Sequence, residues 1–312
     1  MNRTLRVIPV LILFGYMVLL LSSCVRENAT DSAMEEAVRE VAPEVPRRAG
    51  AQSGCKTVEG RLTTSVAGID LDFRFPATKY QGDLLILHAW NDAPSSWCSR
   101  SRICTKALNK GYRIIMPAMG KSVYCMQAYA ETREDWQKFP TLNFLKDTLI
   151  PALREEYCVL KEGGYNFVIG LSAGARGAVR LVEEMPDLFV SAAALSGDYD
   201  PSLMKSDNIY RGFLGEYEAH PERWEKAENL AQHVAKVRTP LYLGHGEQDD
   251  FAPHTQSVEL YNALRRANPN LNVRLNVAPD RGGSFGYWNY EISNIFRFFE
   301  QAQADLPEGS GY

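Results

Sequence analysis

The stretch VIGLSAGARGAVRL, residues 168–181, decides the fold of this 312-residue chain. It starts as an apolar run of strand length and continues as a helix, and Gly170 to Gly174 form the pattern G-x-S-x-G at the join. The glycines permit a sharp turn that lifts the hydroxyl of Ser172 above the end of the strand. The amide of Ala173 opens the helix, whose N-terminus favours negative charge. The stretch therefore predicts a nucleophilic serine, with an ordinary tight turn as the alternative.

Apolar runs of strand length alternate with helical patterns on both sides of this turn. Strands that are apolar throughout and alternate with helices form a parallel sheet buried on both faces, so an α/β fold is expected. The predicted strands cover residues 83–89, 112–118, 165–170, 189–196, 240–246 and 271–277. The predicted helices cover 174–185, 222–236 and 253–267, and two more are indicated by the leucines of 142–153 and by the apolar residues of 292–299.

Residues 56–305 have the composition of a single globular domain, without an internal repeat or an internal linker. The formal net charge is −4, and both signs are distributed along the chain without a basic block. A nucleic-acid partner is therefore not expected. The last residues, 306–312, are expected to form a flexible tail.

The first residues resemble an export signal. Asn2, Arg3 and Arg6 give a polar, basic start, and the apolar run of residues 7–21 is shorter than the roughly 20 residues that a membrane-spanning helix needs. The sequence LSSC at residues 21–24 resembles the lipobox of bacterial lipoproteins, in which the cysteine is lipidated and becomes the new N-terminus. A signal peptide over 1–23 is therefore predicted, with a retained signal anchor as the alternative.

The lipid on Cys24 would hold the protein at the cell envelope through the membrane. If the organism has an outer membrane, Val25 in place of an aspartate favours sorting to that membrane. Residues 24–55 contain few large apolar side chains and cannot bury enough surface to offset the entropy of ordering. They are expected to be a disordered tether.

Five cysteines follow Cys24, and an odd number in an oxidising compartment predicts one or two disulfides and a leftover thiol. The favoured bridge is one among Cys98, Cys104 and Cys125, which flank one predicted strand. A metal site is the alternative, but no C-x-x-C pair or histidine cluster supports it, so no metal is expected.

Two further segments lie where an acyl-transfer site would need them. LHAWNDAPSSW, residues 87–97, follows the first predicted core strand, and the amide of Ala89 or Trp90 could complete an oxyanion hole with that of Ala173. His88 is expected to organise this loop by hydrogen bonds rather than to transfer protons, and Arg176 is expected to anchor nearby loops.

The segment GHGEQDDFAP, residues 244–253, resembles the H-G-x-x-D-x-x-V-P segment of esterases and dienelactone hydrolases. It places Asp249 at the position of the catalytic acid. Asp250 and Asp198 are the alternatives. Acidic residues after strands are also often helix caps.

Serine before acid is the chain order of the α/β-hydrolase fold. With GLSAGARGA, LSGDYDP, GHGEQDDFAP and the final Tyr287-Trp288, the chain resembles the esterase-D and feruloyl-esterase-like group of that superfamily over roughly residues 80–300. The resemblance implies a mostly parallel sheet with helices on both faces. It also implies ester hydrolysis through an acyl-enzyme, on sugar-linked or other small esters, without a cofactor.

The chain departs from this group at the triad histidine. The group's last motif is approximately G-H-x-x-x-Y-W, and the matching segment PDRGGSFGYW, residues 279–288, places Gly282 at the glycine and Gly283 at the histidine. A shift of one position would place Ser284 there, which is no better as a base. Serine needs an adjacent base to become a good nucleophile, so weak or altered ester hydrolysis is expected.

His254 is the nearest candidate for a substitute base, because it lies at the start of the helix after the acid segment. His220 and His233 lie in polar, helix-like stretches and are expected to be solvated. Three hypotheses remain: a tethered esterase with a relocated base, a non-catalytic relative that binds a carbohydrate or acyl ligand, and a structural envelope protein.

Overall fold

The computed structural model of the chain describes residues 54–56 and 58–307. The predicted signal peptide, residues 1–23, Cys24 and most of the predicted tether lie outside the described residues, as does most of the predicted tail. No helix in the described part of the chain is long and apolar enough to cross a membrane.

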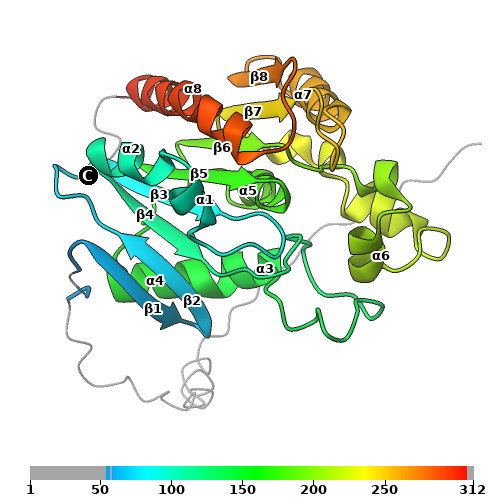
Figure 1. The fold of residues 1–312 in the computed structure, drawn as a ribbon, viewed down its shortest axis with the longest axis horizontal. Helices are drawn as coiled ribbons and strands as arrows, with labels where there is room; N and C mark the ends of the chain where they lie inside the picture. Colours follow the sequence, from blue (N-terminus) through cyan, green and yellow to red (C-terminus); the bar gives the residue numbers. More distant parts are fainter. Residues whose placement is uncertain (1–53, 57, 308–312) are drawn as a thin grey trace, which may run out of the picture. The chain divides into compact units, whose positions relative to one another are not determined.

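The described residues form an eight-stranded sheet in the order β1-β2-β4-β3-β5-β6-β7-β8 (Figure 1). The first two strands are antiparallel to their neighbours, and β4, β3, β5, β6, β7 and β8 are parallel. The predicted fold class, a mostly parallel sheet of the α/β-hydrolase type, is confirmed. The strands are β1 (Arg61–Val66), β2 (Ile69–Arg74), β3 (Gly82–Leu87), β4 (Tyr112–Pro117), β5 (Asn166–Leu171), β6 (Ser191–Leu195), β7 (Leu241–Gly246) and β8 (Val273–Ala278).

Helices cover both faces of the sheet (Figure 1). Side chains alternate along each strand, so the neighbours Leu84 and Leu85 belong to different hydrophobic clusters. The cluster with Leu85 includes residues of α3, α4, α5 and α7, and the cluster with Leu84 includes residues of α1, α2 and α8. The helices are α1 (Ser96–Arg100), α2 (Ile103–Asn109), α3 (Leu142–Phe144), the π-helical turn η1 (Leu145–Leu149), α4 (Ile150–Tyr157), α5 (Ala173–Glu184), α6 (Asn208–Leu214), α7 (Thr255–Ala267) and α8 (Phe285–Ala304).

The structure differs from the sequence prediction in two segments. The β1–β2 hairpin was not predicted, because β1 alternates exposed and partly buried residues, as an antiparallel edge strand does, and lacks the continuous apolar run of the central strands. The helix predicted over 222–236 is wrong. This segment forms the short turns η3 (Arg223–Ala227), η4 (Leu230–Gln232) and η5 (Val234–Lys236), since the side chain of Asn229 accepts a hydrogen bond from the amide of Ala231 and starts a new turn.

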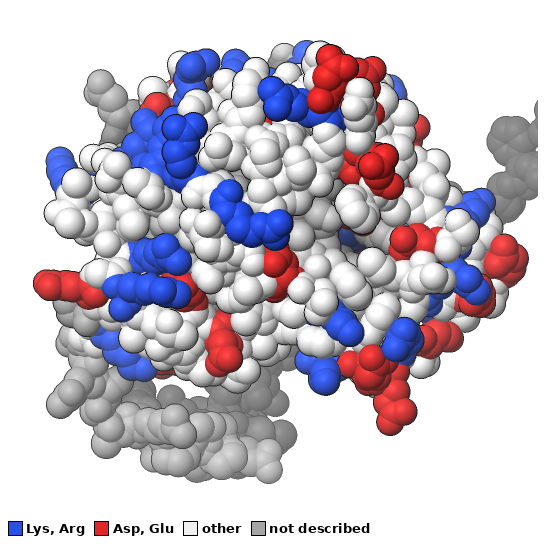
Figure 2. Space-filling model, viewed as in Figure 1, with Lys and Arg blue, Asp and Glu red and all other residues white. Residues whose placement is uncertain are grey.

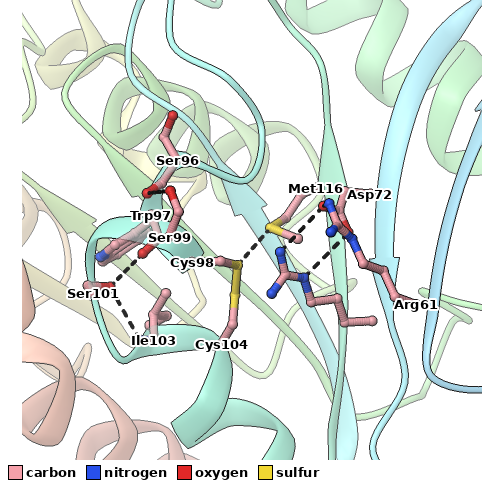
Figure 3. Close-up of a disulfide and its surroundings, with 11 residues drawn as sticks. Arg61, Asp72, Ser96, Trp97, Cys98, Ser99, Ser101, Ile103, Cys104 and Met116 are labelled. Atoms are coloured by element: carbon pink, nitrogen blue, oxygen red, sulfur yellow. Dashed lines mark hydrogen bonds and ion pairs between the residues drawn. A yellow bond between two sulfur atoms is a disulfide. The ribbon is translucent and has the colours of Figure 1, made fainter.

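Two disulfides connect segments that lie between the strands or before the first strand. Cys98–Cys104 joins α1 to α2, and the sulfur of Cys98 lies 3.3 Å from that of Met116 on β4 (Figure 3). A second bridge joins Cys55 to Cys158, and Cys125 is a buried free thiol. The predicted bridge within the set of Cys98, Cys104 and Cys125 is therefore confirmed, together with the leftover thiol.

Charged side chains of both signs are interspersed on the face that Figure 2 shows. The described residues contain no group of three or more histidine, cysteine, aspartate and glutamate side chains that could hold a metal ion.

Candidate active site

The turn between β5 and α5 has the geometry of a nucleophile elbow. Ser172 adopts φ 50° and ψ −120°, a backbone conformation that side-chain-bearing residues rarely take. A Cβ atom at Gly174 would lie 2.7 Å from the carbonyl oxygen of His88, and one at Gly170 would lie 2.6 Å from the amide nitrogen of Ala175. Both neighbours are backbone atoms that cannot move aside. The turn therefore needs glycine at both positions, which explains the G-x-S-x-G pattern.

Ser172 opens into a pocket of about 370 Å³ at the carboxyl ends of the parallel strands, where ligands bind in open α/β sheets. Ala89 and Trp90 follow β3, Ser196 and Asp198 follow β6, and Asp249 follows β7. Gly283 and Trp288 come from the segment after β8, and residues of α6 close the remaining side. The pocket thus collects the sequence-predicted serine, its predicted acid and the predicted oxyanion amides. A cavity of about 560 Å³ beside β1 and β2 contains none of them.

The candidate oxyanion amides belong to Ala173, Ala89 and Trp90, all of which line the pocket. No carbonyl group in the described part of the chain accepts a hydrogen bond from these three amides. The amides of the pocket floor are thus available to a developing oxyanion, which is the requirement for this kind of electrostatic stabilisation.

His88 holds the loop that carries two of these amides. Its Nδ1 lies 2.7 Å from the carbonyl oxygen of Ala89, and its Nε2 lies 2.8 Å from the amide nitrogen of Met119. Because an amide can only donate, Nε2 accepts and Nδ1 carries the proton, so the ring is neutral. Burial lowers the pKa of His88, which agrees with this state. His88 organises the loop, as the sequence indicated.

Asp249 lies at the pocket with its carboxylate held by backbone groups. Its Oδ1 accepts hydrogen bonds from the amides of Phe251 (3.0 Å) and Ala252 (3.2 Å). The alternative acid Asp250 is exposed and does not line the pocket, whereas Asp198 does.

Gly283 lies directly beside this carboxylate. A Cβ atom at Gly283 would lie 2.6 Å from Cγ of Asp249. The carboxyl group therefore occupies the space that a side chain at residue 283 would enter. A histidine here would be next to the acid and at the pocket wall, which is the place of a triad base.

The five histidines of the chain all lie in its described part, and none lines the pocket. The structure does not bring His254 to Ser172: it precedes α7, and its Nδ1 lies 3.3 Å from the carbonyl oxygen of Glu247. His220 pairs with Glu131, and Nε2 of His233 lies 3.0 Å from the carbonyl oxygen of Lys226.

His245, which lies four residues before Asp249, was not predicted as a site residue from the sequence. Its Nδ1 is 2.8 Å from Oγ of Ser257, and its Nε2 is 2.9 Å from the carbonyl oxygen of Ala252. The side chain is fully buried, and burial lowers its pKa. Both ring nitrogens thus contact groups of the protein, and through the carbonyl of Ala252 His245 helps to hold the loop that carries Asp249.

Two residues that line the pocket, Trp288 and Asp198, were not predicted to have a role there or were given only as an alternative. Trp288 donates a hydrogen bond from Nε1 to Oγ of Ser196 (3.0 Å), so it forms part of the pocket wall next to the loop after β6. Burial raises the pKa of Asp198 to about 6, while the charge of Arg176 acts in the opposite direction. The position of Asp198 shortly after an apolar strand is the sequence feature that could have indicated its place in the pocket.

Arg176 anchors the pocket wall, as the sequence indicated. Its guanidinium donates to the carbonyl oxygens of Asp198 (3.3 Å) and Tyr199 (3.4 Å) and pairs with the carboxylate of Glu228 at 2.8 Å. Glu228 also pairs with Arg180 at 3.4 Å. These buried charges tie the elbow helix α5 to the loops after β6 and α6.

Comparisons with known proteins agree with this geometry. The Esterase family model, described as "Putative esterase", matches residues 102–299. The diacylglycerol acyltransferase/mycolyltransferase Ag85A of Mycobacterium tuberculosis is 23% identical over 227 residues, which cover 63% of this chain and 66% of the relative. The chain therefore spans just under two thirds of this relative's length.

Solved structures share the fold. A fluorophosphonate-binding serine hydrolase of Staphylococcus aureus, FphF, is 17% identical, covers 77% of this chain and 96% of its own, and has a TM-score of 0.60. MPT51 of Mycobacterium tuberculosis is 17% identical with a TM-score of 0.60, over 78% of this chain and 99% of its own.

Proposed function

The chain belongs to the Esterase family, and we propose that it is a slow carboxylesterase in which Ser172 attacks small esters without a histidine base. The observation that carries this proposal is the coexistence of an intact elbow with Gly283 at the wall where the base would stand. Ser172 and the residues whose amides we propose for the oxyanion hole line the same pocket, and no histidine is among the described residues of its lining.

The proposed reaction follows from the groups that line the pocket. Oγ of Ser172 attacks the ester carbonyl carbon, and the amide of Ala173 with that of Ala89 or Trp90 binds the oxyanion. The serine proton passes to water, the alcohol leaves with a proton from water, and a second water molecule hydrolyses the acyl-serine. No cofactor takes part in these steps.

The expected rate is low because the base contributes most of the activation of serine. Removing the histidine of such a triad costs about 10⁶ in kcat, and the oxyanion hole with binding leaves roughly 10³ to 10⁴ over water. A measurable but slow acylation of Ser172 is the expected behaviour.

A second candidate is a binding protein that holds an acyl or carbohydrate ligand and does not turn it over. The observation that favours this candidate is that no histidine is among the described residues of the pocket lining.

The test is acylation of the purified protein by p-nitrophenyl acetate. We expect slow release of p-nitrophenol and an acetyl group on the peptide that contains Ser172, both of which Ser172→Ala abolishes. A folded wild-type protein that shows no acetylated Ser172 and no release above the buffer rate would exclude the esterase and leave the binding protein.

We also propose a cellular location for the protein. The lipobox-like sequence at residues 21–24 supports a lipoprotein held at the envelope membrane through Cys24. Labelled palmitate incorporated in bacterial cells should appear in the wild-type protein and be lost in Cys24→Ser. Equal incorporation in both proteins would contradict the lipid anchor.

A further inference from the structure

The charged residues that line the pocket are all acidic. They are Asp198, Asp207 and Asp249, and no lysine, arginine or histidine is among the described residues of the lining. Three carboxylates around one cavity repel one another and attract a positive charge. The electrostatics of the pocket therefore depend on how each carboxylate is satisfied.

Two of the three carboxylates are used within the fold. Oδ1 of Asp249 accepts from the two amides described above, and Oδ1 of Asp207 accepts from the amides of Ile209 and Tyr210 at the start of α6. Asp207 is thus a helix cap.

Asp198 differs from these two. Its Oδ1 is buried and accepts no hydrogen bond from any described residue. Burial raises its pKa because it disfavours the charged form, while the charge of Arg176 and the hydroxyl of Tyr210 act in the opposite direction. A buried carboxylate oxygen without a donor is costly, and a positive charge in the pocket beside Asp198 would offset part of that cost through its electrostatic attraction.

Aromatic side chains form much of the remaining wall. Trp90, Tyr210, Phe251 and Trp288 all line the pocket. Nε1 of Trp90 is buried and donates to no described residue. The phenyl ring of Phe251 is 81% exposed, which leaves an aromatic face at the pocket mouth. Aromatic faces attract ammonium groups and add to the attraction of a nearby carboxylate.

Two cations lie near the pocket without lining it: Arg176, whose charge acts on Asp198 and which lies 5.7 Å from the ring centroid of Tyr210, and Lys121. Arg176 lies behind Asp198, but its guanidinium contacts backbone carbonyls and the carboxylate of Glu228 rather than that of Asp198. Lys121 does not line the pocket; its Nζ lies 5.7 Å from the ring centroid of Trp90 and 5.8 Å from that of Trp136.

We propose that the pocket selects ligands with an ammonium group, and specifically esters of amino alcohols, whose ammonium lies against Asp198 and the surrounding aromatic rings. This inference rests on the proposed function only in placing the ester carbonyl at Ser172. The recognition of the ammonium group rests on the charge and the aromatic lining of the pocket.

The test compares choline with its uncharged isostere 3,3-dimethylbutanol in equilibrium binding to the wild-type protein, measured by calorimetry. We expect choline to bind at least about tenfold more tightly, because 1.4 kcal/mol corresponds to a factor of ten and one desolvated cation–aromatic or charge contact reaches that size. Equal affinities, or tighter binding of a neutral methyl glucoside than of choline, would overturn the inference.

Two variants locate the effect. Asp198→Asn should reduce the choline affinity about tenfold and leave that of dimethylbutanol unchanged. Asp250→Asn removes the same charge from an exposed residue outside the pocket lining and should preserve the preference. A loss of similar size in both variants would show a general charge effect and refute a site at Asp198.

The acetate esters of the same two alcohols separate this inference from the proposed function. If choline binds in the manner expected but neither ester acetylates Ser172, the esterase proposal fails and the ammonium site stands. If both esters acetylate Ser172 at equal rates and the alcohols bind equally, the esterase stands and the ammonium site fails.

Discussion

The pocket has two halves, and they differ in which catalytic groups of an esterase they contain. The elbow half consists of Ser172, Ala173 and the loop with Ala89 and Trp90, and it offers a strained serine and unpaired amides. The opposite half, formed after β6, β7 and β8, offers Asp198, Asp249 and Gly283, and no histidine is among its described residues.

The difference shows which features the fold itself preserves. The elbow half depends on backbone geometry: its glycines are required by backbone contacts and its donors are amides. The opposite half depends on a side chain, and a side chain can be lost without disturbing the strand before it or the helix after it. A chain can therefore keep the fold and the nucleophile of its family while its catalytic power is greatly reduced.

The largest expected effect comes from the buried charges that support the elbow half. Glu228→Leu would leave the buried guanidinium of Arg176 without a carboxylate partner, whereas Arg180 would keep its contact with Glu183. Breaking a buried ion pair in this way costs about 3–5 kcal/mol. Urea denaturation should show this loss in the free energy of unfolding. Glu222→Leu, which removes an exposed carboxylate paired with Lys226, is the control and should cost less than about 1 kcal/mol.

Alanine at the glycines of the two halves should give unequal losses of stability. Gly174→Ala should lower the free energy of unfolding by about 3 kcal/mol, because the new Cβ would meet the backbone at His88. Gly283→Ala should cost about 1–2 kcal/mol, because the Asp249 side chain can rotate away, at the loss of the hydrogen bonds from the amides of Phe251 and Ala252. Gly286→Ala, whose Cβ would lie 3.6 Å from Oγ of Ser284, is the control. Equal losses at Gly174 and Gly283 would mean that the halves do not differ in rigidity.

Asp198→Asn should stabilise the protein near pH 7. The pKa of Asp198 in the folded protein, about 6, is above its value of about 3.9 in an unfolded chain, so the folded state binds more protons between these pH values. Its contribution therefore becomes less favourable as the pH rises from about 4 to 6, by on the order of 2 kcal/mol. The gain in Tm of the variant should be present at pH 7.5 and absent at pH 4. An equal gain at both pH values would contradict the raised pKa.

The smallest expected effect is that of His254→Ala. Because this histidine contacts the carbonyl of Glu247 and does not line the pocket, the acylation rate of Ser172 should stay within about twofold of the wild-type rate. A fall of a hundredfold or more would identify His254 as the relocated base.

Much of the fold could be predicted from the sequence because its central strands are apolar on both faces. The glycines of the G-x-S-x-G pattern also indicate one particular turn between a strand and a helix. The segments 165–170 and 240–246 were placed to within one residue of β5 and β7 at each end. β1 was not predicted because its alternating pattern is a weaker signal than an apolar run. The turns from Arg223 to Lys236 were not predicted because Asn229 starts a new turn inside a segment of helical pattern.

The site was predictable where a motif fixes the position, as at Ser172 and Asp249. The Gly283 departure was visible because Tyr287 and Trp288 keep its register. The unpaired state of Asp198 was not visible, since the hydrogen bonds of a carboxylate depend on the three-dimensional surroundings. The role of His245 was hidden for the same reason.

The central claim is that Ser172 lies in an otherwise competent site that lacks its base. The most direct measurement is the second-order rate constant for labelling of Ser172 by a fluorophosphonate in the wild-type protein, Gly283→His and Gly283→Asn. A histidine at 283 can meet the Asp249 carboxylate once the Asp249 side chain has rotated to admit the new Cβ, and it can then take the serine proton. Gly283→His should therefore label at least about 100-fold faster than the wild-type protein. Gly283→Asn, with similar bulk and no base, should not. Equal rates in the wild-type protein and Gly283→His, with both proteins folded, would contradict the account.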